Sequence, residues 1–397
     1  MRLHRRLVPF LSASAMVAAL GCGEESPTGP DEVASPALAA VAAVPLVFRM
    51  VSAGDTHTCG VTTDNLAYCW GSNFLGQLGT GDRTDHIQPA LVAGGLRFRH
   101  VSVGLQHSCG VTTTERAYCW GYGGYGQLGI GTNPTFPSVP VPVAGGFRFS
   151  QVRAGVNHTC AVTPEGVAYC WGNNRDGQLG DWSHTQRHTP VRVGKAYQWR
   201  WVSPGDRHTC GVTTANVAYC WGSNSSGALG VANIITRSYP IPVGGGLLFQ
   251  SIDAGHRHNC AVTTAYRAYC WGAGWSGQLG DGTLTTRSAP KPVAGGHQFQ
   301  QVSATAFHSC GRTRAGRMLC WGSNPRGELG DGTTTNRLTP TPLGVELTLV
   351  QIAAGESPSC AVTTAGRAYC WGENRYGQVG DGTRTQRLLP VPVAGAM

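Results

Sequence analysis

Short runs of β-branched and aromatic residues, separated by polar turns, follow one another along almost the whole chain. In the first such unit, residues 59–62 (CGVT) and 66–70 (LAYCW) flank the polar residues 63–65 (TDN). Two short apolar runs on either side of a polar turn are typical of a β-hairpin. No stretch shows helical periodicity over a useful length, so the pattern predicts an all-β protein.

The hairpin unit HTCGVTTDNLAYCWG, residues 57–71, returns six more times at a step of 50 or 51 residues. Self-similarity at such a period indicates one supersecondary unit that is copied and stacked. In the copy at residues 244–293 we predict strands at 249–254, 259–263, 267–271 and 291–293, with a Gly-rich loop at 272–290. Four short antiparallel strands repeated seven times predict a seven-bladed β-propeller. Residues 44–48 and 390–393 both resemble fourth strands, and we expect their pairing to close the ring.

Each copy has two cysteines with nine residues between them, and Trp-Gly follows the second. If the turn is centred near Asp64, Cys59 and Cys69 lie opposite each other with their Cα atoms about 4.5 Å apart, within disulfide range. Zinc is the competing use, but structural zinc sites need ligands two to four residues apart. We therefore predict one disulfide inside each hairpin: Cys59–Cys69, Cys109–Cys119, Cys160–Cys170, Cys210–Cys220, Cys260–Cys270, Cys310–Cys320 and Cys360–Cys370.

The first 22 residues have the pattern of an export signal. Arg2, Arg5 and Arg6 precede a mostly apolar stretch at 7–20, which is too short to span a membrane. Residues 19–22 (ALGC) resemble the lipobox of bacterial lipoproteins, in which signal peptidase cuts before a cysteine that carries the lipid. Cys22 is also the one cysteine outside the seven pairs, which lipidation explains. Since Ala19 stands where leucine is usual, a plain signal peptide cut elsewhere is the alternative.

Three segments follow from these patterns: a signal peptide at 1–22, a flexible Pro-, Ala- and acid-rich linker at 23–43, and the propeller at 44–397. No later apolar run approaches the length of a spanning helix, so we expect the lipid to be the membrane attachment. The predicted location is outside the cytoplasm, in the periplasm or at the cell surface, where disulfides persist.

Composition and charge agree with this reading and narrow the partners. The chain has 57 glycines and 23 prolines but only 13% charged residues, which suits short strands and many turns. Three positive charges of the formal +9 lie in the signal, leaving +6 spread over all repeats. A nucleic-acid footprint would be a clustered patch or stripe, so we expect no nucleic-acid partner.

The copy at 254–283 carries a family resemblance. Residues 254–263 (AGHRHNCAVT), 268–272 (AYCWG) and 277–283 (GQLGDGT) resemble the repeat of the regulator-of-chromosome-condensation family, in what would be an exported bacterial lipoprotein version. The resemblance implies a seven-bladed propeller but not one function, because members range from exchange factors for small GTPases to secreted bacterial binding proteins, including a propeller-type β-lactamase inhibitor. Thr305, Pro358 and residues 231–233 (VAN) depart from the repeat.

Residues that recur in every copy are interpreted as scaffold. The seven tryptophans after the second cysteine are expected to pack between blades. The recurring histidines invite a metal hypothesis, but we favour a hydrogen bond from each histidine to the backbone of its own blade, and we expect neither a metal nor another cofactor. Asp281, Asp331 and Asp381 are expected to form turns rather than calcium sites. The arginines at 187, 237, 287, 337 and 387 are expected to be structural.

Function is then expected where the copies differ. In a four-stranded meander, the loops after the first and third strands emerge on the same face, and both vary between copies. Exposed aromatic and arginine side chains are enriched at protein interface hot spots. Neutral drift of solvent loops explains the same variation equally well. The candidate binding residues are Phe74, Tyr122, Tyr125, Arg175, Arg207, Arg257, Trp275, Phe307, Arg326 and Tyr376.

The leading hypothesis is a non-enzymatic, monomeric binding or scaffold protein, anchored in the envelope, that recognises another protein or an envelope polymer. Regulation of a small GTPase or of chromatin is the alternative that the resemblance implies, although it conflicts with the signal and the paired cysteines. A propeller enzyme acting on envelope polymers is a third possibility. It would need carboxylates or a nucleophile and base converging in a cleft, and no non-repeated cluster of that kind is evident.

Overall fold

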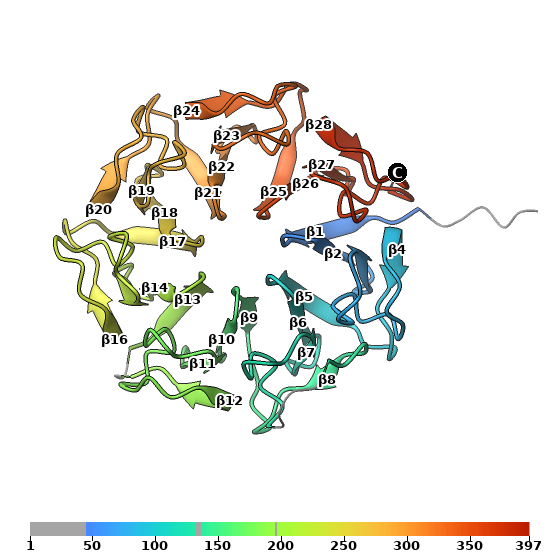
Figure 1. Cartoon of the computed structure of the whole chain (residues 1–397), viewed down its shortest axis with the longest axis horizontal. Helices are drawn as coiled ribbons and strands as arrows, with labels where there is room; N and C mark the ends of the chain where they lie inside the picture. The colour runs from blue at the N-terminus through green and yellow to red at the C-terminus, as the bar shows by residue number, and fades with distance from the viewer. Residues whose placement is uncertain (1–44, 132–135, 195–196, 397) are drawn as a thin grey trace, which may run out of the picture. The chain divides into compact units, whose positions relative to one another are not determined.

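The computed structural model describes residues 45–131, 136–194 and 197–396, within the compact unit Ala43–Met397. Over these ranges the elements are strands, which form seven antiparallel four-stranded sheets. The sheets are arranged around a central axis like the blades of a propeller (Figure 1). The predicted all-β, seven-bladed fold is therefore confirmed. No described helix is long and apolar enough to cross a membrane. The signal peptide at 1–22, the lipidation of Cys22 and the linker at 23–43 lie outside the described residues and stay predictions.

Each blade uses its four strands in chain order, and the blades are numbered 1 to 7 here. The first strands are β1 (Phe48–Ala53), β5 (Phe98–Val103), β9 (Gln151–Ala154), β13 (Trp199–Pro204), β17 (Phe249–Ala254), β21 (Phe299–Ala304) and β25 (Leu349–Ala354). The second strands are β2 (His57–Thr62), β6 (His107–Thr112), β10 (His158–Val162), β14 (His208–Thr213), β18 (His258–Thr263), β22 (His308–Thr313) and β26 (Pro358–Thr363).

The third strands are β3 (Ala67–Gly71), β7 (Ala117–Gly121), β11 (Ala168–Gly172), β15 (Ala218–Gly222), β19 (Ala268–Gly272), β23 (Met318–Gly322) and β27 (Ala368–Gly372). The fourth strands are β4 (His86–Leu91), β8 (Val141–Pro142), β12 (Arg187–Arg192), β16 (Arg237–Pro242), β20 (Arg287–Pro292), β24 (Arg337–Pro342) and β28 (Arg387–Pro392). The fourth strands contain proline, which suits an outer edge because proline cannot donate to a further strand.

The first strand of every blade is innermost and the fourth is outermost (Figure 1). In blade 5, which contains the copy at residues 244–293, the four predicted strands are present, but the fourth, β20, begins at Arg287, earlier than the predicted 291. The prediction that the terminal segments pair as strands is wrong, because β28 pairs only with β27 of its own blade. Among the described residues, the two ends are linked by a backbone hydrogen bond from Leu46 N to Gly395 O at 2.6 Å, and Leu46 and Ala396 pack against the same apolar cluster.

The paired cysteines lie opposite each other on the second and third strands. Cys59 is in register with Cys69, and the same pairing occurs in every blade. The seven pairs are disulfide-bonded, with Cα–Cα distances of 4.0 to 4.2 Å. Each bridge is fully buried and joins neighbouring strands of one blade. The disulfides therefore stabilise single hairpins, as predicted from spacing, and leave the joints between blades to other interactions.

Neighbouring blades are joined at one buried backbone carbonyl. In blade 1 it belongs to Gln77, which accepts hydrogen bonds from the indole Nε1 of Trp120 and the hydroxyl of Ser108 in blade 2, both at 2.9 Å. The same double acceptance occurs at all seven joints, on the carbonyls of Gln77, Gln127, Gln178, Ala228, Gln278, Glu328 and Gln378. The tryptophans thus pack between blades as predicted, and each also donates a hydrogen bond across the joint.

The recurring histidines extend this joint, which corrects the expectation that each bonds the backbone of its own blade. His57 Nε2 lies 2.8 Å from Ser108 Oγ in the next blade. The Ser108 hydroxyl donates its single proton to Gln77 O, so it can only accept from the imidazole. The histidine must therefore donate from Nε2. Five further histidines make the equivalent contact at 2.7 to 2.9 Å: His107, His158, His208, His258 and His308. These six histidines therefore join neighbouring blades, because each has a hydroxyl or amide oxygen of the next blade within hydrogen-bonding distance.

Removing one disulfide tests its contribution. Closing a ring of this length contributes about 2 to 3 kcal/mol on the loop-entropy model, and somewhat less in a hairpin whose ends are already close. We expect the double variant Cys260→Ala/Cys270→Ala to fold with a lower Tm in thermal unfolding followed by circular dichroism. Reductant should lower the Tm of the wild-type protein further, because it opens all seven bridges. An unchanged Tm in both measurements would contradict a stabilising role.

The histidine joints predict acid sensitivity. Burial lowers the pKa of His57, His107, His158, His258 and His308 to about 3. Unfolded histidines take up a proton near pH 6.5, whereas these stay neutral until about pH 3, so the unfolded state binds more protons in that window. Stability should therefore fall as the pH drops from 6.5 towards 3.

The variant His258→Gln separates this effect from the titration of carboxylates. It keeps an N–H donor for Ser309 but does not titrate. We expect its Tm to fall less than that of the wild type between pH 7.5 and pH 4.5. The loss in free energy of unfolding should be smaller by an amount on the order of 2 kcal/mol. His184→Gln, at an exposed histidine outside the joints, should behave as the wild type. Equal pH slopes for His258→Gln and wild type would refute the assignment.

Candidate functional site

The loops after the first and third strands lie side by side on one face of the ring. Ser72, after β3, donates its backbone N–H to Thr56 O, after β1, at 2.9 Å. Ser323 and Phe307 make the same contact in blade 6. We call this surface the loop face. The ten candidate binding residues are all on these two sets of loops, so the sequence placed them on a common face, although their binding role stays a prediction.

Most of the ten candidate residues reach solvent. Tyr122 and Tyr376 are half-buried, and the other eight are exposed: Phe74, Tyr125, Arg175, Arg207, Arg257, Trp275, Phe307 and Arg326. Several arginines are paired locally. Arg326 lies 2.8 Å from Glu373, which also contacts Arg375, and Arg207 is near Asp206 and Asp176. Trp275 and Phe307 belong to blades 5 and 6 and are 46% and 49% exposed.

The structure brings three candidate aromatic residues together at the joint between blades 1 and 2. Tyr122 contacts Tyr125 edge to face, with ring centroids 6.0 Å apart, and stacks on Phe136 at 5.5 Å. The guanidinium of Arg83 donates to the carbonyls of both Phe74 and Phe136 and so links the two loops. Phe74, Tyr125 and Phe136 remain 58%, 39% and 37% exposed. We call these four aromatic residues the aromatic patch; Phe136 was not among the predicted residues.

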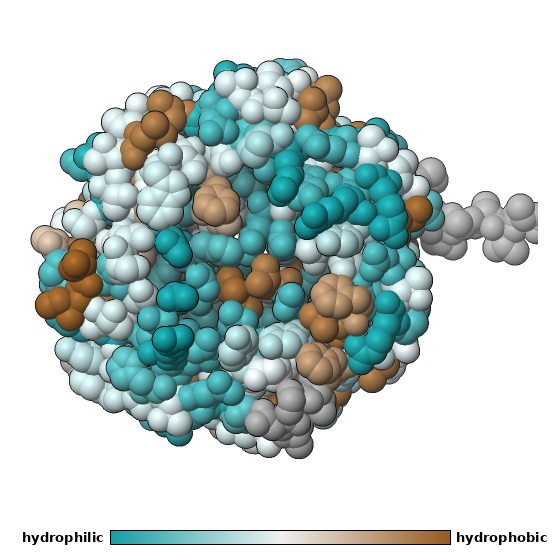
Figure 2. Space-filling view, in the orientation of Figure 1, coloured by the Kyte–Doolittle hydropathy of each residue, from teal (hydrophilic) through white to brown (hydrophobic). Residues whose placement is uncertain are grey.

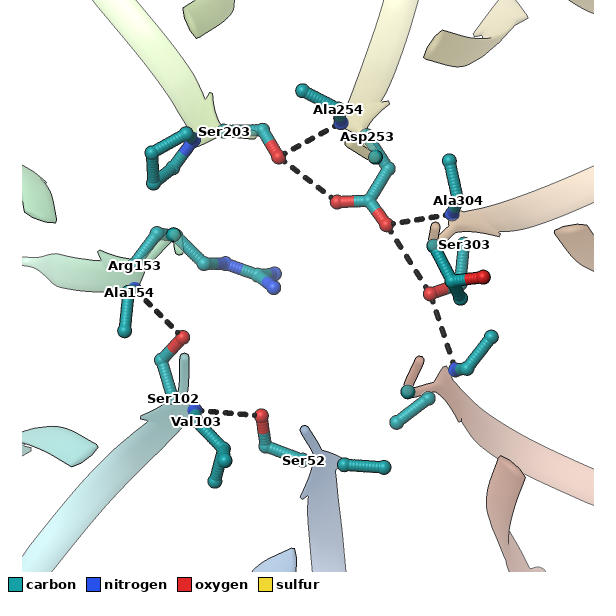
Figure 3. A pocket seen from close by; sticks show the side chains of 18 of the residues that line it. Ser52, Ser102, Val103, Arg153, Ala154, Ser203, Asp253, Ala254, Ser303 and Ala304 are labelled. Atoms are coloured by element: carbon teal, nitrogen blue, oxygen red, sulfur yellow. Dashed lines mark hydrogen bonds between the residues drawn. The ribbon is translucent and has the colours of Figure 1, made fainter. Parts of the chain in front are cut away.

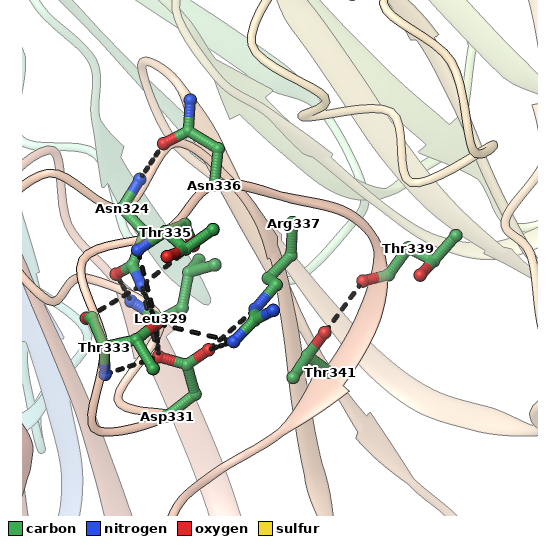
Figure 4. A network of polar contacts seen from close by, with 9 residues as sticks. All are labelled: Asn324, Leu329, Asp331, Thr333, Thr335, Asn336, Arg337, Thr339 and Thr341. Atoms are coloured by element: carbon green, nitrogen blue, oxygen red, sulfur yellow. Dashed lines mark hydrogen bonds and ion pairs between the residues drawn. The ribbon is translucent and has the colours of Figure 1, made fainter.

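The repeated aspartates and arginines of the long loops brace each other. Asp331 Oδ1 accepts from the backbone N and hydroxyl of Thr333, and Oδ2 accepts from Arg337 Nε at 2.8 Å (Figure 4). Asn324 closes the same loop by donating to Asp331 and Thr333. Asp281 and Asp381 bind Arg287 and Arg387 in the same way. Asp181 binds Arg187 likewise, so the predicted turn role of the aspartates and the structural role of Arg187, Arg287, Arg337 and Arg387 are confirmed. Arg237 differs, because Val231 stands in place of the aspartate and, within the described chain, the Arg237 guanidinium contacts only Thr236 O.

A cavity of about 360 Å³ occupies the centre of the ring, lined by the first strands of all seven blades. One position of the repeat faces the cavity in every blade. In blade 1 it is Ser52, two residues before Gly54. The residues there are Ser52, Ser102, Arg153, Ser203, Asp253, Ser303 and Ala353. On the face that Figure 2 shows, the ring surface is mainly hydrophilic and is hollowed at its centre, where some hydrophobic atoms are visible.

The serines at this position are structural. Ser52 Oγ accepts the backbone N–H of Val103 in the next blade at 3.0 Å, and Ser102, Ser203 and Ser303 make the equivalent contact (Figure 3). Asp253 replaces serine in blade 5 and keeps the bond, accepting from Ala304 N at 3.0 Å. It also accepts from the hydroxyls of its two neighbours in the cavity wall, Ser203 and Ser303.

Arg153 replaces serine in blade 3 and extends into the cavity, and Asp253 lies two blades further round the cavity wall (Figure 3). Its guanidinium carbon lies 4.0 Å from the ring centroid of Trp201, a cation–π contact. Burial lowers the pKa of Arg153, and the charge of Asp253 opposes that shift. Burial raises the pKa of Asp253, while Arg153 and the hydrogen bonds from Ala304, Ser203 and Ser303 oppose the rise.

Two histidines, His100 and His256, also line the cavity. Burial, together with the charges of Arg153, Arg49 and Arg99, lowers the pKa of His100 to about 3, so this imidazole is neutral. At the rim, His256 Nε2 contacts a carboxylate oxygen of Glu356 and links the loops of blades 5 and 7. Burial lowers the pKa of His256, but Glu356, Asp206 and Asp55 outweigh it and leave that pKa above its ordinary value.

The sequence profile of the Regulator of chromosome condensation (RCC1) repeat matches seven segments of the chain: 64–111, 115–162, 165–212, 217–262, 267–311, 315–362 and 365–397. The chain belongs to this family. A second profile of the same repeat matches six segments between residues 50 and 378. The resemblance seen in the sequence is therefore confirmed, and its repeats cover most of the described propeller.

Relatives and solved structures agree with this assignment. The ultraviolet-B receptor UVR8 of Arabidopsis thaliana is 34% identical over 136 residues, which is 33% of this chain and 31% of the receptor. The chain thus spans less than a third of that relative's length. Human WBSCR16 superposes with a TM-score of 0.76 at 21% identity, covering 83% of this chain and 94% of that structure. Prp20p of Saccharomyces cerevisiae gives 0.75 at 23% identity, covering 84% and 87%.

Sequence reasoning missed the cavity and Phe136. Within the RCC1-repeat frame, Arg153 and Asp253 appear at a position that is serine in four of the seven blades. This substitution pattern is visible in the sequence, but it indicates a polar cavity only once the first strand is known to be innermost. Phe136 lies in a long loop, and its contact with Tyr122 depends on how that loop folds back.

Proposed function

We propose that this RCC1-repeat protein is a non-enzymatic binding protein that acts outside the cytoplasm, tethered through a lipid on Cys22, and that its aromatic patch recognises a partner protein. Membership of the family supports a binding or regulatory role. The observation that carries the more specific proposal is the patch itself: the rings of Tyr122, Tyr125 and Phe136 contact one another, and Arg83 ties the loop of Phe74 to that of Phe136.

The aromatic patch has the properties of an interface hot spot. Aromatic side chains provide a large apolar contact area with few rotatable bonds, and they dominate the energetics of many protein interfaces. Phe74 and Tyr125 stand at loop positions where blade 4 has Ser225 and Ser226, so the fold does not require aromatic residues there. Arg83 holds both loops by their backbone carbonyls, which leaves the rings free to contact a partner. Contiguous exposed apolar groups of this kind mark interaction sites on soluble proteins.

A protein partner outside the cytoplasm is supported by two further facts. Seven buried disulfides suit an oxidising compartment, because cytosolic thiols are kept reduced. Prp20p, a propeller of the same fold, has been described with its binding properties to Gsp1p and histones. That statement belongs to Prp20p, but it shows that a propeller of this architecture can present a protein-binding surface.

Serine substitutions test the patch while keeping residues that blade 4 already tolerates. A photo-crosslinking residue at Phe74 or Tyr125, introduced in the native host, should give a discrete adduct with one partner protein. With that partner purified, we expect Phe74→Ser and Tyr125→Ser each to weaken binding by about tenfold or more in calorimetry, as for a central hot-spot residue.

Leu248→Ser is the matched control. Leu248 is 49% exposed, and its carbonyl accepts from Thr264 N beside the β18–β19 turn, on the opposite face of the ring. This variant should bind as the wild type. Equal adducts from position 248, or unchanged affinity in both patch variants, would rule out the aromatic patch as the recognition surface.

A further inference from the structure

The central cavity holds a group of polar atoms that the protein itself does not satisfy. Among the described residues that line it, five buried atoms have no hydrogen-bond partner: Arg153 Nε, His100 Nδ1, Trp201 Nε1, Gln250 Nε2 and Ser251 Oγ. Buried polar atoms in native proteins are nearly always paired, so a group of them around one cavity needs an explanation. Four of the five are donors, which favours an acceptor-rich occupant.

The most exceptional of these groups is the guanidinium of Arg153. Within the described part of the chain it has no hydrogen-bonded or ion-paired partner, and its closest defined contact is the face of Trp201. A planar guanidinium matches a carboxylate through two parallel hydrogen bonds. A cation that reaches into a cavity and stacks on an indole, with its donors free, is prepared to receive such an anion.

Asp253 defines the other end of the occupant. It lies on the cavity wall two blades from Arg153, close enough for their charges to interact, and its oxygens already accept from Ser203, Ser303 and Ala304 N (Figure 3). A carboxylate offers about four acceptor positions, so one remains for a donor in the cavity. A phosphate dianion would face this acidic side chain at a cost, whereas an ammonium group would pair with it.

We propose that the central cavity binds a small zwitterion of the amino-acid class, with its carboxylate on Arg153 and its ammonium group towards Asp253. Pockets for small ligands range from about 300 to 1,000 Å³, so a cavity of about 360 Å³ fits a small molecule. The contact between His256 and Glu356 lies at the rim, where the ligand would enter. This site is separate from the aromatic patch, and either proposal can fail without the other.

The matched variants come from the protein's own repeat. Arg153→Ser and Asp253→Ser each introduce the residue that four other blades carry at this position, and a serine at 253 can still accept from Ala304 N as Ser203 does from Ala254 N. Arg153→Ser disrupts no joint either, because the next blade presents Pro204, which has no N–H to satisfy. Arg367→Ser, at an exposed arginine in the turn between β26 and β27 and away from the cavity lining, is the control.

The twenty protein amino acids are titrated one at a time into the wild-type protein by calorimetry, with thermal unfolding in parallel. We expect at least one to bind and raise the Tm, while acetate, ethylamine and inorganic phosphate at the same concentration do not. Both cavity variants should lose at least tenfold in affinity for that amino acid, and Arg367→Ser should not. Because the panel uses wild-type protein, instability of a variant does not prevent the test.

Three results would overturn the proposal. Binding of no amino acid would leave a cavity that holds only water. Binding of acetate or phosphate as tight as that of any amino acid would indicate an adventitious ion only. Unchanged affinity in folded Arg153→Ser and Asp253→Ser would place the ligand somewhere other than the central cavity.

Discussion

The ring depends on one backbone carbonyl per blade that accepts two hydrogen bonds from the next blade. At the joint between blades 1 and 2, Gln77 O receives Trp120 Nε1 and Ser108 Oγ, and His57 donates to the same hydroxyl. Buried polar groups stabilise a fold only when they are paired, and a chain of such bonds leaves little freedom in how two blades pack. The indole of Trp120 also buries its apolar surface at this joint. One side chain therefore both orients the two blades and contributes apolar burial between them.

This joint explains why the fold was predictable from the sequence and its connections were not. Tryptophan, glycine and paired cysteines recur at fixed spacing, and each has a strong local preference that indicates a stapled hairpin. The spacing of Cys59 and Cys69 around a turn near Asp64 predicted that they lie opposite each other on neighbouring strands. The partner of His57, however, lies in the next blade, 51 residues away. Spacing inside one repeat is the same whether the imidazole turns towards its own backbone or towards its neighbour, so the sequence alone could not distinguish them.

The candidate sites differ in predictability for a related reason. Loop residues such as Phe74 and Tyr125 were found because they vary on a constant frame, and exposure followed from their position after Trp-Gly. Arg153 and Asp253 vary in the same way, but on a strand, where variation is normally read as packing. Pro204 explains why arginine is tolerated in blade 3. Serine at this position accepts a backbone N–H from the next blade, which arginine cannot do, but Pro204 has no N–H to donate. The two departures compensate each other, which frees the arginine for the cavity.

The joint between blades 7 and 1 shows which interaction the ring needs. Pro358 replaces the histidine there, and Ala353 replaces the serine, so two of the repeated cross-blade contacts are lost. The side chain of Gln351 bonds both the N–H and the carbonyl of Val51 at 3.0 Å, as Gln301 does with Ile352 at the joint between blades 6 and 7. What remains unchanged is the carbonyl of Gln378, which still accepts from Trp70 Nε1 and Thr58 Oγ1. The chain ends meet at this joint without exchanging a strand, and bonds between loops also cross it: Glu356 donates its backbone N–H to Gly54 O, and Ser357 Oγ donates to Asp55 at 2.6 Å. The circle therefore closes through the carbonyl contact and the buried indole together with these bonds, without the histidine and serine contacts of the other joints.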